Sequence, residues 1–197
     1  MQRAARYIAE RSNMDDNRII DLLFERSENA LDEIKKKYSR LYGYVIRNAV
    51  DNESDAEECE NDLLLSVWNS IPPARPDNLS AYICRIARRI GIDRLRYNTR
   101  SKRNGDLTVM LSELEECLPE RAMTSGERGS EIGEILSEFV RELEPVTRIL
   151  FIRRYVYLET VTGLSGRFEM SENNVAAKLY RARKKLKKKL NKEGINV

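Results

Sequence analysis

The stretch LSAYICRIARRIGIDRLRYNTRSKR, residues 79–103, decides how the first half of the chain is interpreted. It carries eight arginines and lysines and one acid, Asp93, yet it is also rich in isoleucine. At about 100° per residue, a helix would place apolar side chains on one face and cations on the other. The apolar face would consist of Leu79, Ile83, Ile86, Ala87 and Ile90, and the roughly opposite face of Arg85, Arg89, Arg96, Arg100 and Arg103.

A helix is favoured over a strand because the apolar positions recur at three and four residues rather than at two. Ser80 is placed to cap its first turn. A solvated charged surface is the alternative, but such surfaces usually mix both signs, and this one is almost purely cationic. The stretch therefore predicts a helix that packs on one side and binds a polyanion on the other.

Charge is segregated along the chain. The 197 residues suffice for one large domain or two small ones, and 34% of them are charged although the net charge is only +3. Residues 51–62 hold seven acids and no base, and residues 105–144 hold eleven acids against three arginines. The basic runs are 85–103 and 178–192. Such polarity suggests one surface for nucleic acid and others for protein partners.

Several function classes are disfavoured by what the sequence lacks. There is no histidine, the commonest general base and metal ligand, so we expect no enzymatic activity, no metal and no cofactor. Cys59, Cys84 and Cys117 have no CxxC spacing and are expected to be buried small side chains. No apolar run of about eighteen residues occurs, and MQRAARYIAERSN lacks a signal-peptide core. These features indicate a soluble cytoplasmic protein with no membrane partner.

Apolar spacing predicts further helices in the first half of the chain. A short helix, NRIIDLLFER (17–26), precedes a long amphipathic one at 28–50. The next helix runs from Ala56 to Ile71 and ends at PPARP, where proline makes continuation costly. With the basic helix, these segments predict a four-helix unit at residues 14–103.

The second half is predicted to contain a linker and a smaller helical domain. Residues 104–137 combine glycine, proline and net negative charge, which is linker composition. From residue 138 to 193 we expect a helix interrupted at Pro145 and then two helices joined by a tight turn. Ser171 is the expected N-cap of the last helix, and the residues predicted to be buried on it are Val175, Leu179, Ala182, Leu186 and Leu190.

The last helix has the pattern of a recognition helix. Reading a major groove requires short or amide side chains near the helix start and cations that hold phosphates. Asn173, Asn174, Ala177 and Lys178 suit the first task, and Arg181, Arg183, Lys184 and Lys185 suit the second. A lysine-rich solvated terminus is the alternative, but two basic helices in separate domains favour two DNA contacts.

The acidic run DNESDAEECEND, residues 51–62, invites a calcium interpretation. An EF-hand loop requires glycine at its sixth position and glutamate at its twelfth, and here these are Ala56 and Asp62. Metal binding is therefore disfavoured. An acidic helix more plausibly docks on a basic protein surface; the alternative is a solvated helix start stabilised by the helix dipole.

Together these elements resemble bacterial RNA polymerase sigma factors of the sigma-70 family, of the compact extracytoplasmic-function (ECF) type. The resemblance covers about 28–103 and 138–193. SDAEECENDLLLSVWNSI (54–71) is similar to the polymerase-docking helix of that family, and the stretch 79–103 to its minus-ten helix. LEPVTRILFIRRY followed by MSENNVAAKLYRARKKLKK is similar to its minus-thirty-five domain.

The resemblance implies an all-α fold with two small helical domains and a non-enzymatic function. Sigma region 2 would occupy 14–103, an acidic flexible linker 104–137, and the helix-turn-helix of sigma region 4 138–193. The implied partners are core RNA polymerase, through the clamp of its largest subunit, promoter DNA and an anti-sigma protein, and the free chain is expected to be a monomer. The acidic linker would thread basic channels of the polymerase.

Site residues follow from the same resemblance. Polymerase docking is assigned to Asp55, Glu58, Asp62, Leu65 and Trp68, with a core position as the alternative for Trp68. Minus-ten DNA is assigned to Arg85, Arg88, Arg89, Arg96, Tyr97, Asn98, Arg100 and Arg103, and the loop PPARPDN would help to hold an unstacked base. Minus-thirty-five DNA is assigned to Ser171, Asn173, Asn174, Ala177, Lys178, Arg181 and Lys184. Arg94 is expected in an ion pair or a cap instead.

The chain departs from the family pattern before the recognition helix. The family usually has Glu-Ile-Ala and then a turn glycine, whereas this chain has Gly163, Leu164, Ser165 and then Glu169. Glycine inside a helix costs about 1 kcal/mol relative to alanine, and a non-glycine turn residue is strained. We therefore expect a marginally stable second domain. Residues before Met14 match nothing, and Met14 is an alternative start.

Two rival functions remain. A stand-alone helix-turn-helix repressor or activator would bring a dimerisation surface to match a two-fold operator, and none is evident. A recombinase would use tyrosine with arginines and histidine, and the chain has no histidine.

Overall fold

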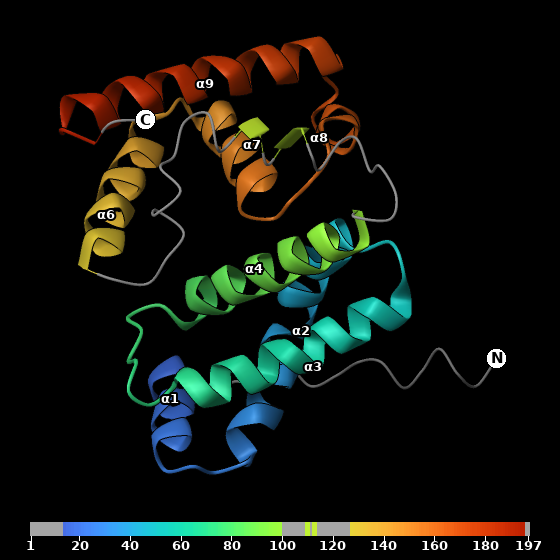
Figure 1. Ribbon diagram of the computed structural model, residues 1–197, viewed down its shortest axis with the longest axis vertical. Coiled ribbons are helices and arrows are strands. Elements are labelled where there is room, and N and C mark those ends of the chain that lie inside the picture. The colour runs from blue at the N-terminus through green and yellow to red at the C-terminus, as the bar shows by residue number, and fades with distance from the viewer. Residues whose placement is uncertain (1–13, 100–108, 111, 114–126, 196–197) are drawn as a thin grey trace. The chain divides into compact units, whose positions relative to one another are not determined.

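The computed structural model describes residues 14–99, 109–110, 112–113 and 127–195 (Figure 1). The fold is all-α, as expected, and the chain divides into two compact units, residues 1–101 and 102–197. The helices are α1 (Asp16–Phe24), α2 (Asn29–Ala49), α3 (Glu53–Ser70), α4 (Leu79–Thr99), α6 (Glu127–Glu142), α7 (Pro145–Tyr155), α8 (Val161–Phe168) and α9 (Glu172–Lys192).

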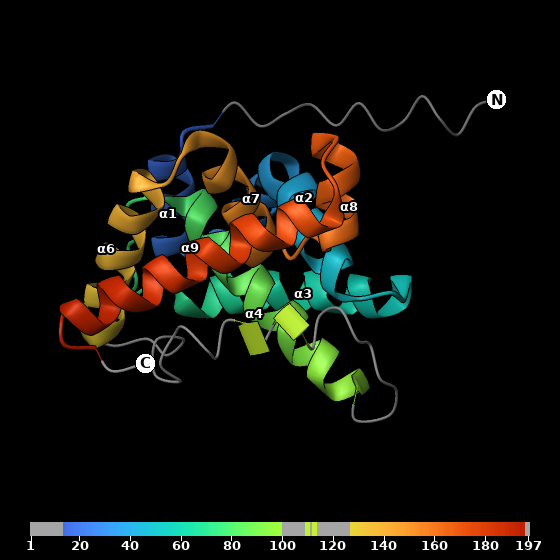
Figure 2. The ribbon, with the colours of Figure 1, turned by 90° about the horizontal axis from the view of Figure 1, so that it is seen from above.

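The first unit consists of α1 to α4, with α2, α3 and α4 in mutual contact. Its core is built from apolar side chains that recur at helical spacing, which is why these segments are helical. The fully buried members include Ile34, Ile46, Leu63, Ile71, Leu79 and Ile83. Figure 2 shows the same unit from above, with α3 and α4 side by side, as their contacts require.

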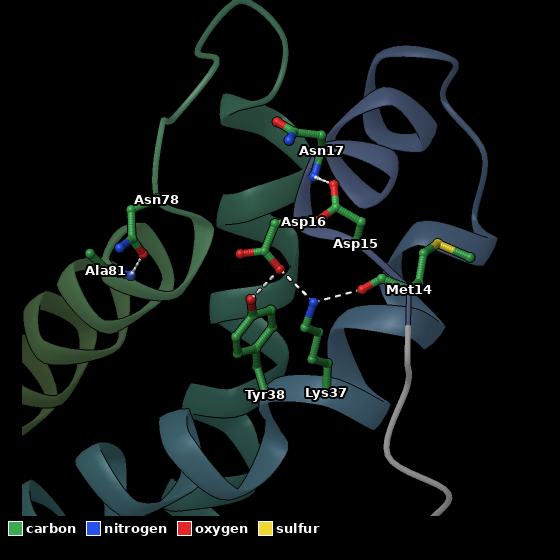
Figure 3. A network of polar contacts seen from close by, with 8 residues as sticks. All are labelled: Met14, Asp15, Asp16, Asn17, Lys37, Tyr38, Asn78 and Ala81. Carbon is green, nitrogen blue, oxygen red and sulfur yellow. Dashed lines mark hydrogen bonds and ion pairs between the residues drawn. The ribbon is translucent and has the colours of Figure 1, made fainter.

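Helix α1 is joined to α2 by a small polar network (Figure 3). Lys37 Nζ lies 2.7 Å from Asp16 Oδ1 and donates to the carbonyl oxygen of Met14 at 2.6 Å. The Tyr38 hydroxyl donates to the same Asp16 oxygen at 2.5 Å. Burial works to raise the pKa of Asp16, but the hydrogen bonds from Lys37 and Tyr38 outweigh it and lower that pKa. The chain from Met14 onward is thereby fixed to the bundle.

Two details of the basic helix differ from the sequence prediction. The cap of α4 is Asn78, whose Oδ1 accepts from the Ala81 amide at 2.8 Å, and not Ser80. Ile90 is half-buried, whereas Ile92 and Leu95, on another side of the helix, are buried. The predicted single stripe was too narrow because α4 packs against both α2 and α3.

The second unit is built around α9, which contacts α6, α7 and α8. The interruption expected at Pro145 is confirmed: α6 ends at Glu142, and α7 restarts with Pro145 in its first turn. Glu144 caps α7 by accepting from the amides of Val146 and Thr147 at 3.2 and 3.1 Å. The five residues predicted to be buried on α9 are all buried.

Part of the segment predicted as a linker is helical. Residues 127–137 belong to α6, and Ile132 in this helix is buried. The glycines suggested a linker, but Ile132, Ile135, Leu136 and Phe139 repeat at three and four residues, and this repeat prevailed. Met110 is also fully buried. The linker prediction for 114–126 lies outside the described residues.

Other sequence expectations concern single side chains. Cys59 and Cys84 are buried free thiols, as expected, and Cys117 lies outside the described residues. Within the ranges that the structure describes, no helix is both long and apolar enough to span a membrane.

Candidate nucleic-acid interface

Helix α4 presents a cationic surface to solvent. Arg85, Arg89 and Arg96 are exposed, as predicted, and Tyr97 is 71% exposed near the end of the helix. The guanidinium of Arg85 lies 4.9 Å from the ring centre of Tyr82. This surface combines positive charge with aromatic rings, the combination that accepts both phosphates and bases.

The remaining predicted DNA residues of α4 differ in their surroundings. Arg88 is half-buried; burial and the charge of Arg96 lower its pKa to about 10, so it stays charged at neutral pH. Asn98 is exposed but donates through Nδ2 to Asp55 Oδ2 at 2.9 Å. Arg100 and Arg103 lie outside the described residues.

Arg94 joins α4 to the acidic helix α3. Its guanidinium lies 2.8 Å from Glu58 Oε1 and 3.5 Å from Asp55 Oδ1, and its side chain is only 18% exposed. The expectation that Arg94 forms an ion pair is therefore confirmed. Asp55 and Glu58, predicted for polymerase docking, thus both pair with Arg94, and Asn98, predicted for DNA, binds Asp55.

On the other side of α3, Arg47 of α2 binds Glu53 and Glu60, each at 2.5 Å. Four of the seven acids in residues 51–62 therefore pair with an arginine from a neighbouring helix. Sequence reasoning expected an ion pair for Arg94 but did not identify its partners. It missed the pairs of Arg47 altogether, because nothing local to α3 indicates that Arg47 and Arg94 flank it. The acidic run serves in part to hold the bundle together.

The rest of the predicted docking surface is exposed. Asp62 is exposed, and Leu65 is 58% exposed. Trp68 is half-buried; the Arg26 guanidinium lies 5.3 Å from its ring centre and donates to its carbonyl at 2.7 Å. The half-buried indole is neither fully in the core nor fully on the surface, so its assignment to polymerase docking stays a prediction.

The loop PPARPDN, residues 72–78, is tied to α1. Arg75 lies 2.7 Å from Asp21 Oδ1, and its guanidinium covers the ring of Phe24 at 5.3 Å. Asn78 at the end of the loop caps α4. The loop is therefore anchored at its middle by Arg75 and at its end by Asn78, next to the start of the cationic helix.

The N-terminal turns of α9 match the predicted recognition helix. Ser171 is the N-cap, as expected, and its Oγ accepts from the Asn174 amide at 3.3 Å. Asn173, Asn174 and Arg181 are exposed, and Arg181 Nε donates to the Ala177 carbonyl at 3.1 Å. Ala177 and Lys178 are half-buried, and Lys178 Nζ lies 3.9 Å from Glu144 Oε2.

A cavity of about 150 Å³ lies where α9 meets the junction of α6 and α7. Three cationic side chains, Lys178, Arg181 and Lys185, contribute to its lining, together with Leu143, Glu144, Thr147 and Ala182. These three cations of α9 therefore lie near the start of α7.

Tyr180 is a surface residue that the sequence-based site assignment left out. It is 49% exposed, and Lys184 Nζ lies 5.0 Å from its ring centre. Interaction with Tyr180 raises the pKa of Lys184. A tyrosine four residues before a lysine on one helix face is the signal that would have identified it.

Arg183 was expected to hold phosphate, but it is bound within the unit. Its NH1 lies 3.1 Å from Glu113 Oε1 and donates to the Tyr155 hydroxyl at 2.6 Å, and its side chain is 12% exposed. The physical reason is its position, one residue after buried Ala182 and therefore at the edge of the apolar stripe.

The turn between α8 and α9 has the strain expected at Glu169. This residue caps α8 with φ 52° and ψ 40°, the left-handed conformation that favours glycine. At the start of α8, Thr160 Oγ1 accepts from the Gly163 amide at 3.0 Å. The turn connects Glu169, the C-cap of α8, to Ser171, the N-cap of α9.

The architecture defines a two-unit helical protein with a cationic helix in each unit. Family models match the chain twice: Sigma-70 region 2 at residues 34–101 and Sigma-70, region 4 at residues 133–186. These matches together cover more than half of the chain. A search of the curated proteins gives no match.

The chain therefore belongs to the sigma-70 family and is a sigma factor of the extracytoplasmic-function type, with the region 2 and region 4 domains that serve promoter recognition. Region 2 corresponds to α2, α3 and α4, and region 4 to most of α6 through α9.

Proposed function

We propose that the protein binds core RNA polymerase through α3 and directs it to a two-part promoter, with α4 at the minus-ten element and α9 at the minus-thirty-five element. The observation that carries this proposal is the presence of an exposed cationic helix in each of the two sigma regions, in the family's order. The protein would act without catalysis of its own, as a specificity subunit.

The chemistry of α4 supports contact with opened DNA. Separating a duplex requires a surface that accepts unstacked bases and single-stranded backbone. Arg85, Arg89 and Arg96 supply charge, and exposed Tyr97 supplies a ring on which a base can stack. The anchored loop 72–78 stands next to the start of the same helix, which suits a role in holding one base.

The polymerase-docking surface is smaller than the acidic run suggests. Asp55 and Glu58 are bound to Arg94, so Asp62 and Leu65 are the strongest candidates for contact with a basic clamp. A charged residue beside an exposed leucine fits an interface in which apolar burial gives affinity and charge gives orientation. An anti-sigma protein would compete for these same surfaces.

Transcription from fragmented genomic DNA tests the function directly. Purified protein is mixed with bacterial core RNA polymerase, and the run-off transcripts are sequenced. Transcripts that start downstream of a shared two-part element are expected. Specific DNA binding without such transcripts would replace the proposal with a stand-alone repressor or activator.

The docking surface is tested by Asp62→Lys, which should abolish co-purification with core polymerase. Glu57→Lys is the matched control, because Glu57 is exposed on a different side of α3 and undergoes the same change of charge. Circular dichroism checks that both variants fold. Retained co-purification of Asp62→Lys would remove this residue from the interface.

The minus-thirty-five helix is tested by the salt dependence of DNA binding. Lys184→Ala should weaken binding to all sequences alike and reduce the salt slope by about one unit. Lys192→Ala, at the exposed end of α9, is the control that should leave the slope unchanged. An unaltered slope for Lys184→Ala would mean that this ammonium does not meet phosphate.

A further inference from the structure

Glu113 lies outside both family matches, which end at residue 101 and begin again at residue 133. Its carboxylate nevertheless stands among side chains of the helix-turn-helix unit. Oε1 lies 3.1 Å from Arg183 NH1, and Oε2 accepts from the Tyr155 hydroxyl at 3.1 Å. Oε2 also lies 3.6 Å from Nε of Arg154. One acid from the intervening segment thus reaches both α7 and α9.

The two arginines at this carboxylate have little access to water. The side chain of Arg154 is fully buried, and that of Arg183 is 12% exposed. The carboxylate of Glu159, also buried, pairs with Arg153 and Arg167, and the Glu159 carbonyl accepts from Arg154 NH1 at 2.9 Å. Because cations removed from water need a nearby anion, the Glu113 carboxylate contributes negative charge to Arg154 and Arg183.

The contacts of Glu113 continue to the exposed surface of α9. Arg183, which Glu113 holds, lies 5.9 Å from the ring centre of Tyr180, and Lys184 lies 5.0 Å from the same ring. Burial and the charge of Glu113 raise the pKa of Tyr155, so its hydroxyl stays protonated and can donate. Met110, three residues before Glu113, is fully buried and fixes the segment in place.

We propose that Glu113 is a positioning residue of the recognition helix. By holding Arg183, it sets the orientation of the Tyr180 ring and the Lys184 ammonium at the surface that meets DNA. The inference rests on the proposed function, because it presupposes that α9 binds DNA. It also extends the functional DNA-binding unit to include Glu113, upstream of the region 4 match.

The test uses full-length protein and a duplex that carries the element found in the run-off experiment. Glu113→Gln keeps the shape and the acceptor but removes the charge, and it should weaken binding roughly tenfold, the size of coupling within one ion-pair network. Glu113→Asp keeps the charge and should recover part of the affinity. Glu134→Gln, an exposed acid of α6, is the matched control and should bind like wild type.

A double-mutant cycle separates positioning from general stability. If Glu113 acts through Arg183, Glu113→Gln should cause no further loss of DNA affinity in an Arg183→Gln background. Hydrogen exchange in α7 should still increase in that background, because Arg154 loses its acid as well. Additive losses of affinity, or wild-type affinity of Glu113→Gln, would overturn the inference.

Failure of the proposed function gives a different result. Wild-type protein would then show no specific DNA binding. Hydrogen exchange alone would then test whether Glu113 is linked to α9. Faster exchange in α9 of Glu113→Gln, with α2 to α4 unchanged in the same molecule, would retain the link between Glu113 and the helix. Unchanged exchange in α9 would overturn it.

Discussion

Helices α4 and α9 are both 21 residues long and both basic, yet they use their cations differently. Helix α4 packs against two helices, and its Arg94 and Asn98 are bound to acids of α3. Helix α9 buries one apolar stripe and leaves most of its lysines in solvent. The comparison shows that the acids of neighbouring helices, rather than basic composition, determine which cations remain exposed on each helix.

The largest expected effects come from truncating the core face of each helix. Ile83 of α4 and Leu186 of α9 are both fully buried. Ile83→Ala and Leu186→Ala should each cost about 2–5 kcal/mol, because the removed methyl groups leave a cavity. If the two units unfold separately, hydrogen exchange measured by mass spectrometry should increase only in the unit that carries the substitution.

Equal loss of protection in both units from either variant would contradict this separation. Such a result would mean that α4 and α9 belong to one cooperatively unfolding structure. The two helices would then differ only in their surface chemistry.

Arg94 and Arg89 give the sharpest contrast within α4. Arg94→Gln removes the ion pairs to Asp55 and Glu58 and should lower the free energy of unfolding by about 1–2 kcal/mol, a value reduced by the exposure of Glu58. Arg89→Gln removes an exposed charge and should leave stability within about 0.5 kcal/mol of wild type.

DNA binding should show the opposite order. Arg89→Gln should weaken binding to a duplex with an opened minus-ten segment, whereas Arg94→Gln should affect it only through stability. Chemical denaturation and fluorescence anisotropy measure the two properties. Equal weakening of DNA binding by both variants would assign Arg94 to the DNA surface. The distinction between Arg94, paired with α3, and the exposed Arg89 would then be wrong.

These contrasts also show how far the sequence could lead. Apolar periodicity predicted the helices, the interruption at Pro145, the Ser171 cap and the buried stripe of α9, because these features depend on residues a few positions apart. The pairs of Arg94 with Asp55 and of Arg183 with Glu113 span 39 and about 70 residues, and no local pattern indicates them. The part of α6 at residues 127–137 was missed because its glycines outweighed a weak apolar repeat.

The strained connection before α9 allows a stabilising change that α4 does not offer. Glu169→Gly should raise the stability of the second unit by roughly 0.5–1 kcal/mol, because glycine adopts a positive φ without a Cβ penalty. Gly166→Ala should add about 1 kcal/mol, since a Cβ there meets nothing within 4 Å.

Gly163→Ala is the control for these two variants. Its Cβ would lie 3.1 Å from Thr160 Oγ1, the atom that caps α8, so the helix-propensity gain should be offset by disturbance of the cap. Thermal unfolding of the three variants measures the differences. A gain for Gly163→Ala as large as that for Gly166→Ala would show that the cap is easily displaced.

The smallest effect concerns acid, which should weaken the titratable cap of α7 beside α9 and leave the amide cap of α4 unchanged. Glu144 caps α7 and faces Lys178 of α9, and hydrogen bonds from Thr147 and Val146 lower its pKa. A lowered carboxyl pKa stabilises the fold above the ordinary glutamate range and loses this contribution as the pH falls through the lowered value. Glu144→Gln should therefore reduce stability slightly at pH 7, and the difference from wild type should shrink toward pH 2.

Asn78→Ala supplies the comparison for α4. Its amide caps the helix without titrating, so the loss of about 1 kcal/mol should be the same at every pH at which the unit is folded. Urea unfolding followed between pH 7 and pH 2 measures both differences. If the difference in free energy of unfolding between Glu144→Gln and wild type did not depend on pH, the Glu144 cap would act through its shape rather than its charge. The caps of α7 and α4 would then respond to acid in the same way.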